Sequence, residues 1–266
     1  MRLARIAHPT DGFAFAELRG DINDADAVSC AEISEHPFGD PLFTGREWPL
    51  SEVRLLAPIL PSKIICVGKN YADHAAEMGA EAPESPLIFM KPNTTVVGPG
   101  IPIVYPPSSE RVDHEAELAV VIGQPCRNVN AARAMEVVLG YTIGNDVTAR
   151  DQQATDGQWT RAKGYDTFCP LGPWIDTTID PNGLDISARI TNSDGGVTDR
   201  QSGNTSQFIH TIGDVIEYVT AIMTLMPGDV ILTGTPAGVG PMLPGDTVTV
   251  GIEGLGRLSN PVVDPA

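Results

Sequence analysis

The sequence predicts a β-rich α+β protein with a small N-terminal subdomain, and three observations support this fold class. Short apolar runs alternate with turn residues along most of the chain. The 27 glycines and 23 prolines follow no repeating period, which is typical of many tight turns between strands. Pro-Gly-Asp turns lead twice into apolar strands, and no regular βαβ rhythm is present. A barrel of alternating strands and helices is therefore disfavoured.

The first elements are predicted in a separate N-terminal part. The segments LARIA and GFAFAEL alternate like strands, and the turn-rich sequence His-Pro-Thr-Asp-Gly between them predicts a β-hairpin. A polar stretch follows, and a denser pattern of short strands begins after Pro61. We therefore assign residues 1–57 to a small N-terminal subdomain and residues 58–266 to the main domain.

The main domain is predicted to contain mostly short strands. These are expected at residues 64–67, 86–90, 101–104, 115–122, 140–143, 186–190, 230–233 and 247–252. A helix is predicted over 130–139, with Gly140 as its C-terminal cap. Apolar residues at three- and four-residue steps predict a second, amphipathic helix over 208–223.

Charge and composition exclude several partners and locations. The formal charge of −17 means that nucleic acid or an anionic membrane would be repelled, so we expect neither as a partner. No apolar stretch approaches the roughly 20 residues that span a bilayer, and the N-terminus has no apolar run typical of a signal peptide. The four cysteines form no CxxC pair. We expect a cytoplasmic protein.

Three familiar catalytic signatures are absent from the sequence. The segment HEAEL begins like a zinc-protease helix but has Leu118 where the second histidine ligand would be needed. No G-x-S-x-G motif occurs. The glycines of GTPAGVG have the wrong order for dinucleotide binding, and no lysine follows them for a phosphate loop. These absences exclude three large classes of enzyme.

Glu115 and Glu117 form the strongest chemical signal. In a strand both side chains lie on one face, about 7 Å apart along the chain. Two neighbouring carboxylates at the start of an apolar run repel each other unless a cation lies between them. Oxygen ligands favour Mg²⁺, with Mn²⁺ or Ca²⁺ as substitutes. The alternative is a solvated edge strand with two surface glutamates.

Asp146 is a candidate third ligand. It follows the apolar stretch GYTIGN, so it is expected where a strand ends, and Arg150 and Gln153 follow within seven positions. Three carboxylates and water would make an open octahedral site with free positions for substrate oxygens. The alternative is that Asp146 caps the N-terminus of a helix over VTARDQQ.

His74 and Glu77 form a second candidate group. Three positions apart on a short helix, they would lie on one face and could form a hydrogen bond. A carboxylate beside a histidine fixes its tautomer and raises its basicity, as a general base requires. Gly79 would end this helix and could let it move as a lid. An ordinary exposed helix face is the alternative.

Seven segments, taken together and in this order, resemble one known protein family, although no single segment is specific to it. They are VGKNYADHAAE, PLIFMKPNTTVVGPG, HEAELAVVIG, GYTIGNDVTARDQQ, GQWTRAKGYDTFCPLGP, MTLMPGDVILTGTPAGVG and IEGLGRLSNPV. Together they resemble the fumarylacetoacetate hydrolase family from about Lys63 to Val262. The resemblance implies a mixed β-sandwich roll, a homodimer, dependence on Mg²⁺ or Mn²⁺, and a small 2-oxo acid as substrate.

The resemblance also implies roles for individual residues. It assigns metal binding to Glu115, Glu117 and Asp146, and acid–base chemistry to His74 and Glu77. Lys163 matches an active-site lysine of the family, and Arg150, Gln153 and Thr235 match residues that contact the substrate. Without the resemblance, Lys163 would be read as a surface lysine and Thr235 as a turn residue. His114 is expected to point to the other strand face and play a structural part, and the cysteines are expected to have no catalytic part.

These expectations predict a Mg²⁺-dependent enzyme acting on small enolisable 2-oxo dicarboxylates or acylpyruvates. Hydrolysis of a carbon–carbon bond through a stabilised enolate ranks first. Oxaloacetate-type decarboxylation and keto–enol or double-bond isomerisation are the alternatives, because each needs the same enolate. A non-catalytic, metal-dependent carboxylate-binding protein is an alternative of another class, although such a protein has no use for a general base.

Overall fold

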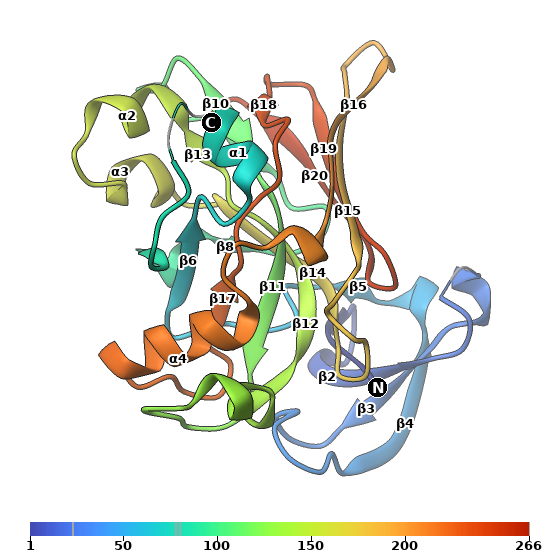
Figure 1. Cartoon of the computed structure of the whole chain (residues 1–266). Helices are drawn as coiled ribbons and strands as arrows, with labels where there is room; N and C mark the ends of the chain where they lie inside the picture. Colours follow the sequence, from blue (N-terminus) through green and yellow to red (C-terminus); the bar gives the residue numbers. More distant parts are fainter. Residues whose placement is uncertain (23, 78, 80, 266) are drawn as a thin grey trace.

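The structure is a computed structural model that describes residues 1–22, 24–77, 79 and 81–265. Within this part of the chain, strands dominate and group into one large sheet and two smaller ones (Figure 1). The β-rich α+β prediction is confirmed. No helix of the described residues is both long and apolar enough to cross a bilayer.

The large sheet has the order β4-β3-β2-β1-β14-β12-β11-β17-β6-β7, with β5 paired to β1 and β8 paired to β14. Its strands are β1 (Arg2–His8), β2 (Gly12–Arg19), β3 (Ser29–Ile33), β4 (Phe43–Pro49), β5 (Arg54–Leu55), β6 (Ile64–Gly68), β7 (Leu87–Lys91), β8 (Val96–Val97), β11 (Ala116–Ile122), β12 (Val138–Asn145), β14 (Cys169–Asp176) and β17 (Val230–Leu232).

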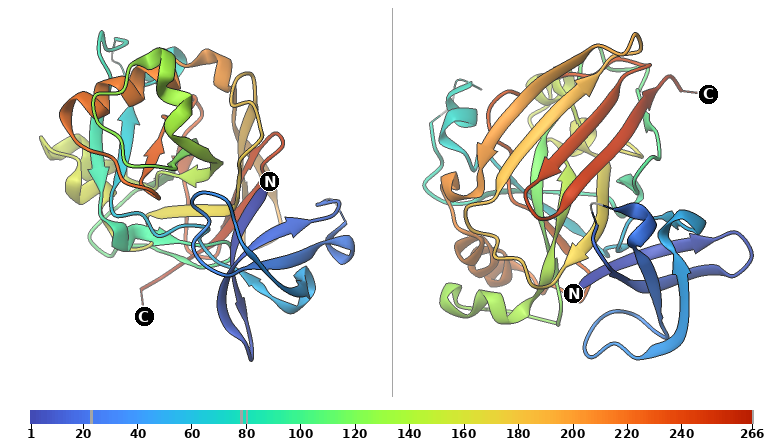
Figure 2. Two further views of the ribbon diagram at one scale, coloured as in Figure 1. Left: turned by 90° about the horizontal axis from the view of Figure 1, so that it is seen from below. Right: turned by 90° about the vertical axis from the view of Figure 1, so that its right-hand side faces the viewer.

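The two smaller sheets complete the β structure. The first has the order β13-β10-β18, and the second has the order β16-β15-β19-β20-β9. Their strands are β9 (Ile103–Val104), β10 (Val112–His114), β13 (Thr148–Ala149), β15 (Asp185–Thr191), β16 (Val197–Asn204), β18 (Gly240–Pro241), β19 (Thr247–Ile252) and β20 (Gly256–Val263). Figure 2 shows β15, β16, β19 and β20 of the second sheet, yellow to red, as a separate layer beside the green strands of the large sheet.

The N-terminal strands form the predicted hairpin. β1 and β2 pair antiparallel down to His8 and Gly12, and Gly12 has a φ of +85°, which favours glycine. These strands project from the rest of the molecule (blue in Figure 2), but β1 also pairs with β14, so one sheet runs through both parts. The division at residues 57 and 58 stays a prediction.

β11 is central to the fold. It lies between β12 and β17 and is buried along its whole length, so the solvated edge strand considered above is wrong. Its side chains alternate between two apolar clusters. Leu118 and Val120 pack into the core between the large sheet and β15 and β19, whereas Ala119 and Val121 pack on the other face with residues of β6 and β17. Glu117 shares the second face.

The helices are few and short among the described residues. They are α1 (Ala72–Glu77), α2 (Arg150–Thr155), α3 (Thr160–Lys163) and α4 (Ile212–Ile222), with 3₁₀ turns η1 (Ala25–Ala27), η2 (Leu50–Glu52), η3 (Asn93–Thr95), η4 (Ala131–Val137) and η5 (Thr205–Gln207). The helix predicted over 208–223 begins later, at Ile212, because Thr211 and Asp214 form a capping box. Phe208 instead packs its ring against Tyr71.

The prediction of a helix over 130–139 that ends at Gly140 is wrong, both in the type of helix and in where it ends. The segment is a 3₁₀ turn, η4, and the chain enters β12 directly after it. Gly140 therefore lies inside a strand and caps no helix. A Cβ at Gly140 would meet the carbonyl oxygen of Asp176 at 2.3 Å, so glycine allows the close approach of β12 and β14.

Candidate active site

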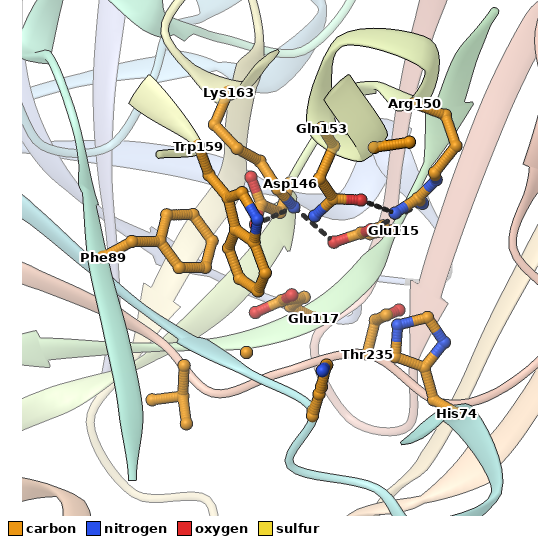
Figure 3. Close-up of a pocket in the computed structure, with 14 residues that line it drawn as sticks. His74, Phe89, Glu115, Glu117, Asp146, Arg150, Gln153, Trp159, Lys163 and Thr235 are labelled. Carbon is orange, nitrogen blue, oxygen red and sulfur yellow. Dashed lines mark hydrogen bonds and ion pairs between the residues drawn. The ribbon is translucent and has the colours of Figure 1, made fainter. Parts of the chain in front are cut away.

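Three buried carboxylates converge at one end of the β11–β12 pair. Glu115 directly precedes β11, Glu117 lies within it, and Asp146 directly follows β12. The antiparallel register pairs Ala116 with Asn145, which brings the start of one strand beside the end of the other. One carboxylate oxygen from each of the three acids lies within 4.8 Å of one oxygen of each of the other two (Figure 3).

Cationic side chains surround two of these acids. Lys163 donates to Oε2 of Glu115 and to Oδ2 of Asp146, each at 2.7 Å, and Lys91 donates to Oδ1 of Asp146 at 2.6 Å. Arg150 donates to Oε1 of Glu115 at 2.7 Å. Asp146 is thus held by two lysines and is no helix cap, because the residue at the N-cap of α2 is Ala149.

Glu117 differs from the other two acids. It accepts a hydrogen bond of 2.7 Å from the backbone N–H of Gly234, and no lysine or arginine of the described residues forms an ion pair with it. Burial and the negative charges of Asp146 and Glu115 raise the pKa of the Glu117 carboxyl well above its usual range. The cluster therefore lacks positive charge at Glu117.

The cationic neighbours have the opposite effect on Glu115. Burial opposes its ionisation, but the charges of Lys163 and Arg150 hold the pKa of this carboxyl well below its usual range. Burial likewise disfavours the charged form of Lys163, yet Asp146 and Glu115 outweigh it and raise the pKa of the ammonium. Three buried oxygen donors with a local deficit of positive charge fit a hard divalent cation such as Mg²⁺ or Mn²⁺.

Arg150 is the first residue of α2 and is fixed from both sides. Its Nε donates to Oδ2 of Asp113 at 2.9 Å, and its Nη1 donates to Oε1 of Gln153 at 2.6 Å. Asp113 is completely buried and also pairs with Arg111. The guanidinium is therefore held at the wall of the site, beside Glu115 and Gln153.

His74 and Glu77 interact as predicted from their spacing on α1. His74 Nδ1 lies 3.1 Å from Oε2 of Glu77, and the backbone N–H of Gly238 donates to Oε1 of Glu77 at 3.1 Å. His74 is buried, so the alternative of an ordinary exposed helix face is wrong for it. Gly79 adopts a turn with a φ of +66° after the helix.

One cavity of about 240 Å³ brings these groups together. Every residue predicted for the site except Glu77 lines it. Thr235 is buried in its wall and is no exposed turn residue; its hydroxyl donates to the carbonyl of Ala116 at 2.8 Å and accepts from Gln201. Lys163 is also buried, so the reading as a surface lysine is wrong. The cavity contains no cysteine.

Two aromatic rings form another part of the cavity wall. Phe89 and Trp159 meet edge to face with their ring centres 5.2 Å apart. In Figure 3 they lie together at the left, while His74 lies at the lower right. The site therefore has apolar surface as well as its charged residues.

Five residues at or beside this cavity were not predicted from the sequence: Lys69, Lys91, Asp113, Phe89 and Trp159. A usable signal existed for Lys91, since it directly follows the apolar run LIFM, where a lysine is unusual. Asp113 precedes HEAE and gave no signal that distinguishes it from a surface acid. His114 is buried, bonds Gln201 through Nδ1 and lies outside the cavity lining, in agreement with its expected structural part.

Comparison with known proteins supports the resemblance. The family described as fumarylacetoacetate (FAA) hydrolase, C-terminal, matches residues 63–263, and the family described as Rv2993c-like, N-terminal, matches residues 1–58. A solved 5-carboxymethyl-2-hydroxymuconate delta-isomerase from Mycobacterium smegmatis is 58% identical, with 100% of both chains covered and a TM-score of 0.91.

Two further relatives are named for activities other than that isomerisation. The mitochondrial oxaloacetate tautomerase of Rattus norvegicus is 45% identical over 227 residues, which is 81% of this chain and 71% of the relative. A maleylpyruvate hydrolase from Sphingobium sp. SYK-6, solved with manganese(II) and pyruvate, is 32% identical, with 100% of both chains covered and a TM-score of 0.78. The resemblance is confirmed, as is the fold of the fumarylacetoacetate hydrolase type that it implies. The chain belongs to the fumarylacetoacetate hydrolase family.

Proposed function

We propose that the protein is a divalent-metal-dependent enzyme that moves a proton next to the carbonyl of a small 2-oxo acid, as a keto–enol tautomerase or double-bond isomerase. One observation carries the proposal: the buried carboxylate cluster lines the same cavity as His74, and Nδ1 of His74 lies 3.1 Å from Oε2 of Glu77. The relatives named as an isomerase and a tautomerase support this order of candidates, since both are more similar than the hydrolase.

Glu115, Glu117 and Asp146 would hold the cation, with Mg²⁺ the first candidate and Mn²⁺ or Ca²⁺ as substitutes. When bound, such an ion supplies Lewis-acid polarisation of the substrate's oxygen atoms. The Mn²⁺ and pyruvate named for the maleylpyruvate hydrolase structure support this choice of cation and ligand. The donor set of three buried carboxylates is the reason that comes from this chain itself.

The protein's own side chains provide the rest of the chemistry. Glu77 accepts from Nδ1 of His74, which leaves Nε2 of the imidazole free to take a proton from the substrate carbon and to return one. Lys163 would stabilise the negative charge that develops on the enolate oxygen, because a fixed ammonium acts strongly in a buried site. Arg150, Gln153 and Thr235 would bind the carboxylate end of the substrate.

Hydrolysis of a carbon–carbon bond, which the sequence alone ranks first, is the second candidate. The same His74–Glu77 pair could activate a water molecule, and a solved relative with a TM-score of 0.78 is named as a hydrolase. Oxaloacetate-type decarboxylation would need the metal site and Lys163 but no general base. The hypothesis of a non-catalytic carboxylate-binding protein would account for the metal site but not for the His74–Glu77 pair.

The experiment compares two substrates with added Mg²⁺ or Mn²⁺, each with and without a chelator. Enol oxaloacetate reports tautomerisation through the loss of its enol absorbance, and pyruvate formation from the same substrate reports decarboxylation. Acetylpyruvate reports hydrolysis through pyruvate and acetate. We expect metal-dependent loss of the enol to be the fastest reaction. Turnover that survives the chelator would contradict the metal assignment, and hydrolysis as the fastest reaction would reverse the order of the two candidates.

We also propose that the protein is a homodimer in the cytoplasm, as the family resemblance and the sequence predict. Size-exclusion chromatography with light scattering tests the first part.

A further inference from the structure

Lys69 is a cation in the cavity wall whose side chain has no partner. It follows Gly68, the last residue of β6, and precedes α1, and it is partly buried. Within residues 1–22, 24–77, 79 and 81–265, no hydrogen bond or ion pair reaches its ammonium. Lys69 nevertheless lines the same cavity as the carboxylate cluster and His74.

The other charged groups of this cavity are all engaged by the protein itself. Lys163 lies between Glu115 and Asp146, and Arg150 is held by Asp113, Glu115 and Gln153. Glu117 accepts from Gly234, and His74 pairs with Glu77. Lys69 therefore differs from every other ionisable residue of the lining, because its partner is not provided by the described part of the chain.

The backbone holds Lys69 in an unusual conformation. Its φ is +58°, in the left-handed region that favours glycine and costs other residues about 1 kcal/mol. The following residue, Asn70, is anchored at both ends of its amide: it donates to the carbonyl of Thr233 at 2.8 Å and accepts from the N–H of His210 at 2.8 Å. These two hydrogen bonds anchor the backbone next to Lys69 at the cavity wall.

We propose that Lys69 binds the distal carboxylate of the substrate, so that the enzyme selects 2-oxo dicarboxylates over acylpyruvates with an uncharged end. This inference rests on the proposed function, in which the 2-oxo acid end is bound by the cation, Arg150 and Gln153. With a second carboxylate, the Lys69 ammonium gains a charge-assisted hydrogen bond in a partly buried place. An apolar tail would instead displace water from the ammonium without forming a hydrogen bond or ion pair with it. The preference is strong because a substrate without the distal carboxylate leaves the ammonium desolvated and unpaired, which weakens the binding of that substrate.

The test is equilibrium binding to the Mg²⁺-loaded protein by calorimetry, with two acids of equal chain length. 2-Oxoglutarate has the distal carboxylate, and 2-oxopentanoate lacks it. We expect the wild type to prefer 2-oxoglutarate by about ten- to a hundredfold. Lys69→Met should abolish this preference by weakening 2-oxoglutarate alone, while Lys69→Arg should keep most of it. Lys69→Gly gives the same result without backbone strain, should the methionine variant fold poorly.

Arg257→Met is the matched control, because it removes one exposed positive charge on β20 and should keep the full preference. Equal binding of the two acids by the wild type, or equal weakening of both in Lys69→Met, would overturn the inference and leave the proposed function intact. If the Mg²⁺-loaded wild type binds neither acid, the proposed function fails together with the inference.

Discussion

Oδ2 of Asp113 accepts a hydrogen bond of 2.9 Å from Nε of Arg150. This contact joins β10 to the first residue of α2, and it fixes the guanidinium beside Glu115 at the cavity wall. Asp113 touches the cavity only through Arg150, so its effect on the reaction would be one of positioning. Arg111 donates to both oxygens of the same carboxylate, which orients Asp113 in turn.

Asp113→Asn should raise KM for a 2-oxo acid about tenfold with a smaller change in kcat, because the guanidinium loses its charged support but keeps its contact with Glu115. Steady-state kinetics with the metal-loaded enzyme measure both constants. Asp199→Asn, which alters an exposed acid paired with Arg189, is the control and should change neither constant. Equal KM values for Asp113→Asn and the wild type would remove Asp113 from substrate positioning.

His74→Ala should separate the reactions that need proton transfer from the one that does not. We expect tautomerisation and acetylpyruvate hydrolysis to fall by about 10²- to 10⁴-fold, because a general base is lost. Some metal-dependent decarboxylation of oxaloacetate should remain. The control His36→Ala changes an exposed histidine outside the cavity lining and should leave all three rates unchanged. Equal losses of all three activities in His74→Ala would argue against a distinct part in proton transfer.

Lys91→Met should destabilise the metal-free protein by about 3–5 kcal/mol, because it leaves part of the buried Asp146 carboxylate without its cation. Urea denaturation monitored by fluorescence measures the free energy of unfolding. Arg133→Met breaks an exposed pair with Glu136 and should cost well under about 1 kcal/mol. A loss of similar size for the two variants would show that the Lys91 pair contributes little to the fold.

The four cysteines should be inert in the native protein. All are buried, and burial raises the pKa of the Cys30 thiol to about 11 and that of the Cys169 thiol to about 12. A raised pKa keeps a thiol protonated at neutral pH, and only the thiolate attacks a disulfide reagent. A titration with an aromatic disulfide reagent at pH 8 should therefore detect no fast-reacting thiol until denaturant is added. Fast reaction of one equivalent before unfolding would contradict this.

The sequence predicted those parts of the site that depend on short-range order. A strand period of two places Glu115 and Glu117 on one face, and a helical step of three places His74 beside Glu77; both relationships are present in the structure. The β1–β2 hairpin was predictable for the same reason. The positions of Lys91 and Asp113 depend on which distant strands pair, and a single sequence does not contain that register.

The errors have a similar physical origin. Gly140 looked like a helix cap because glycine commonly ends helices. Its position is instead set by the close approach of Asp176 on β14, which lies 36 residues further along the chain. The edge-strand alternative failed because β12 and β17 pair with β11 on its two sides. The surface-lysine alternative failed because Lys163 is buried and donates to Glu115 and Asp146, which are distant in sequence.

The central claim is that Glu115, Glu117 and Asp146 bind one divalent cation, and a calorimetric titration of Mg²⁺ or Mn²⁺ into metal-free protein tests it most directly. We predict one site per chain in the wild type and in Glu136→Ala, which removes an exposed acid, and loss of that site in Glu117→Ala. An unchanged titration curve for Glu117→Ala, or no binding by the wild type, would contradict the claim.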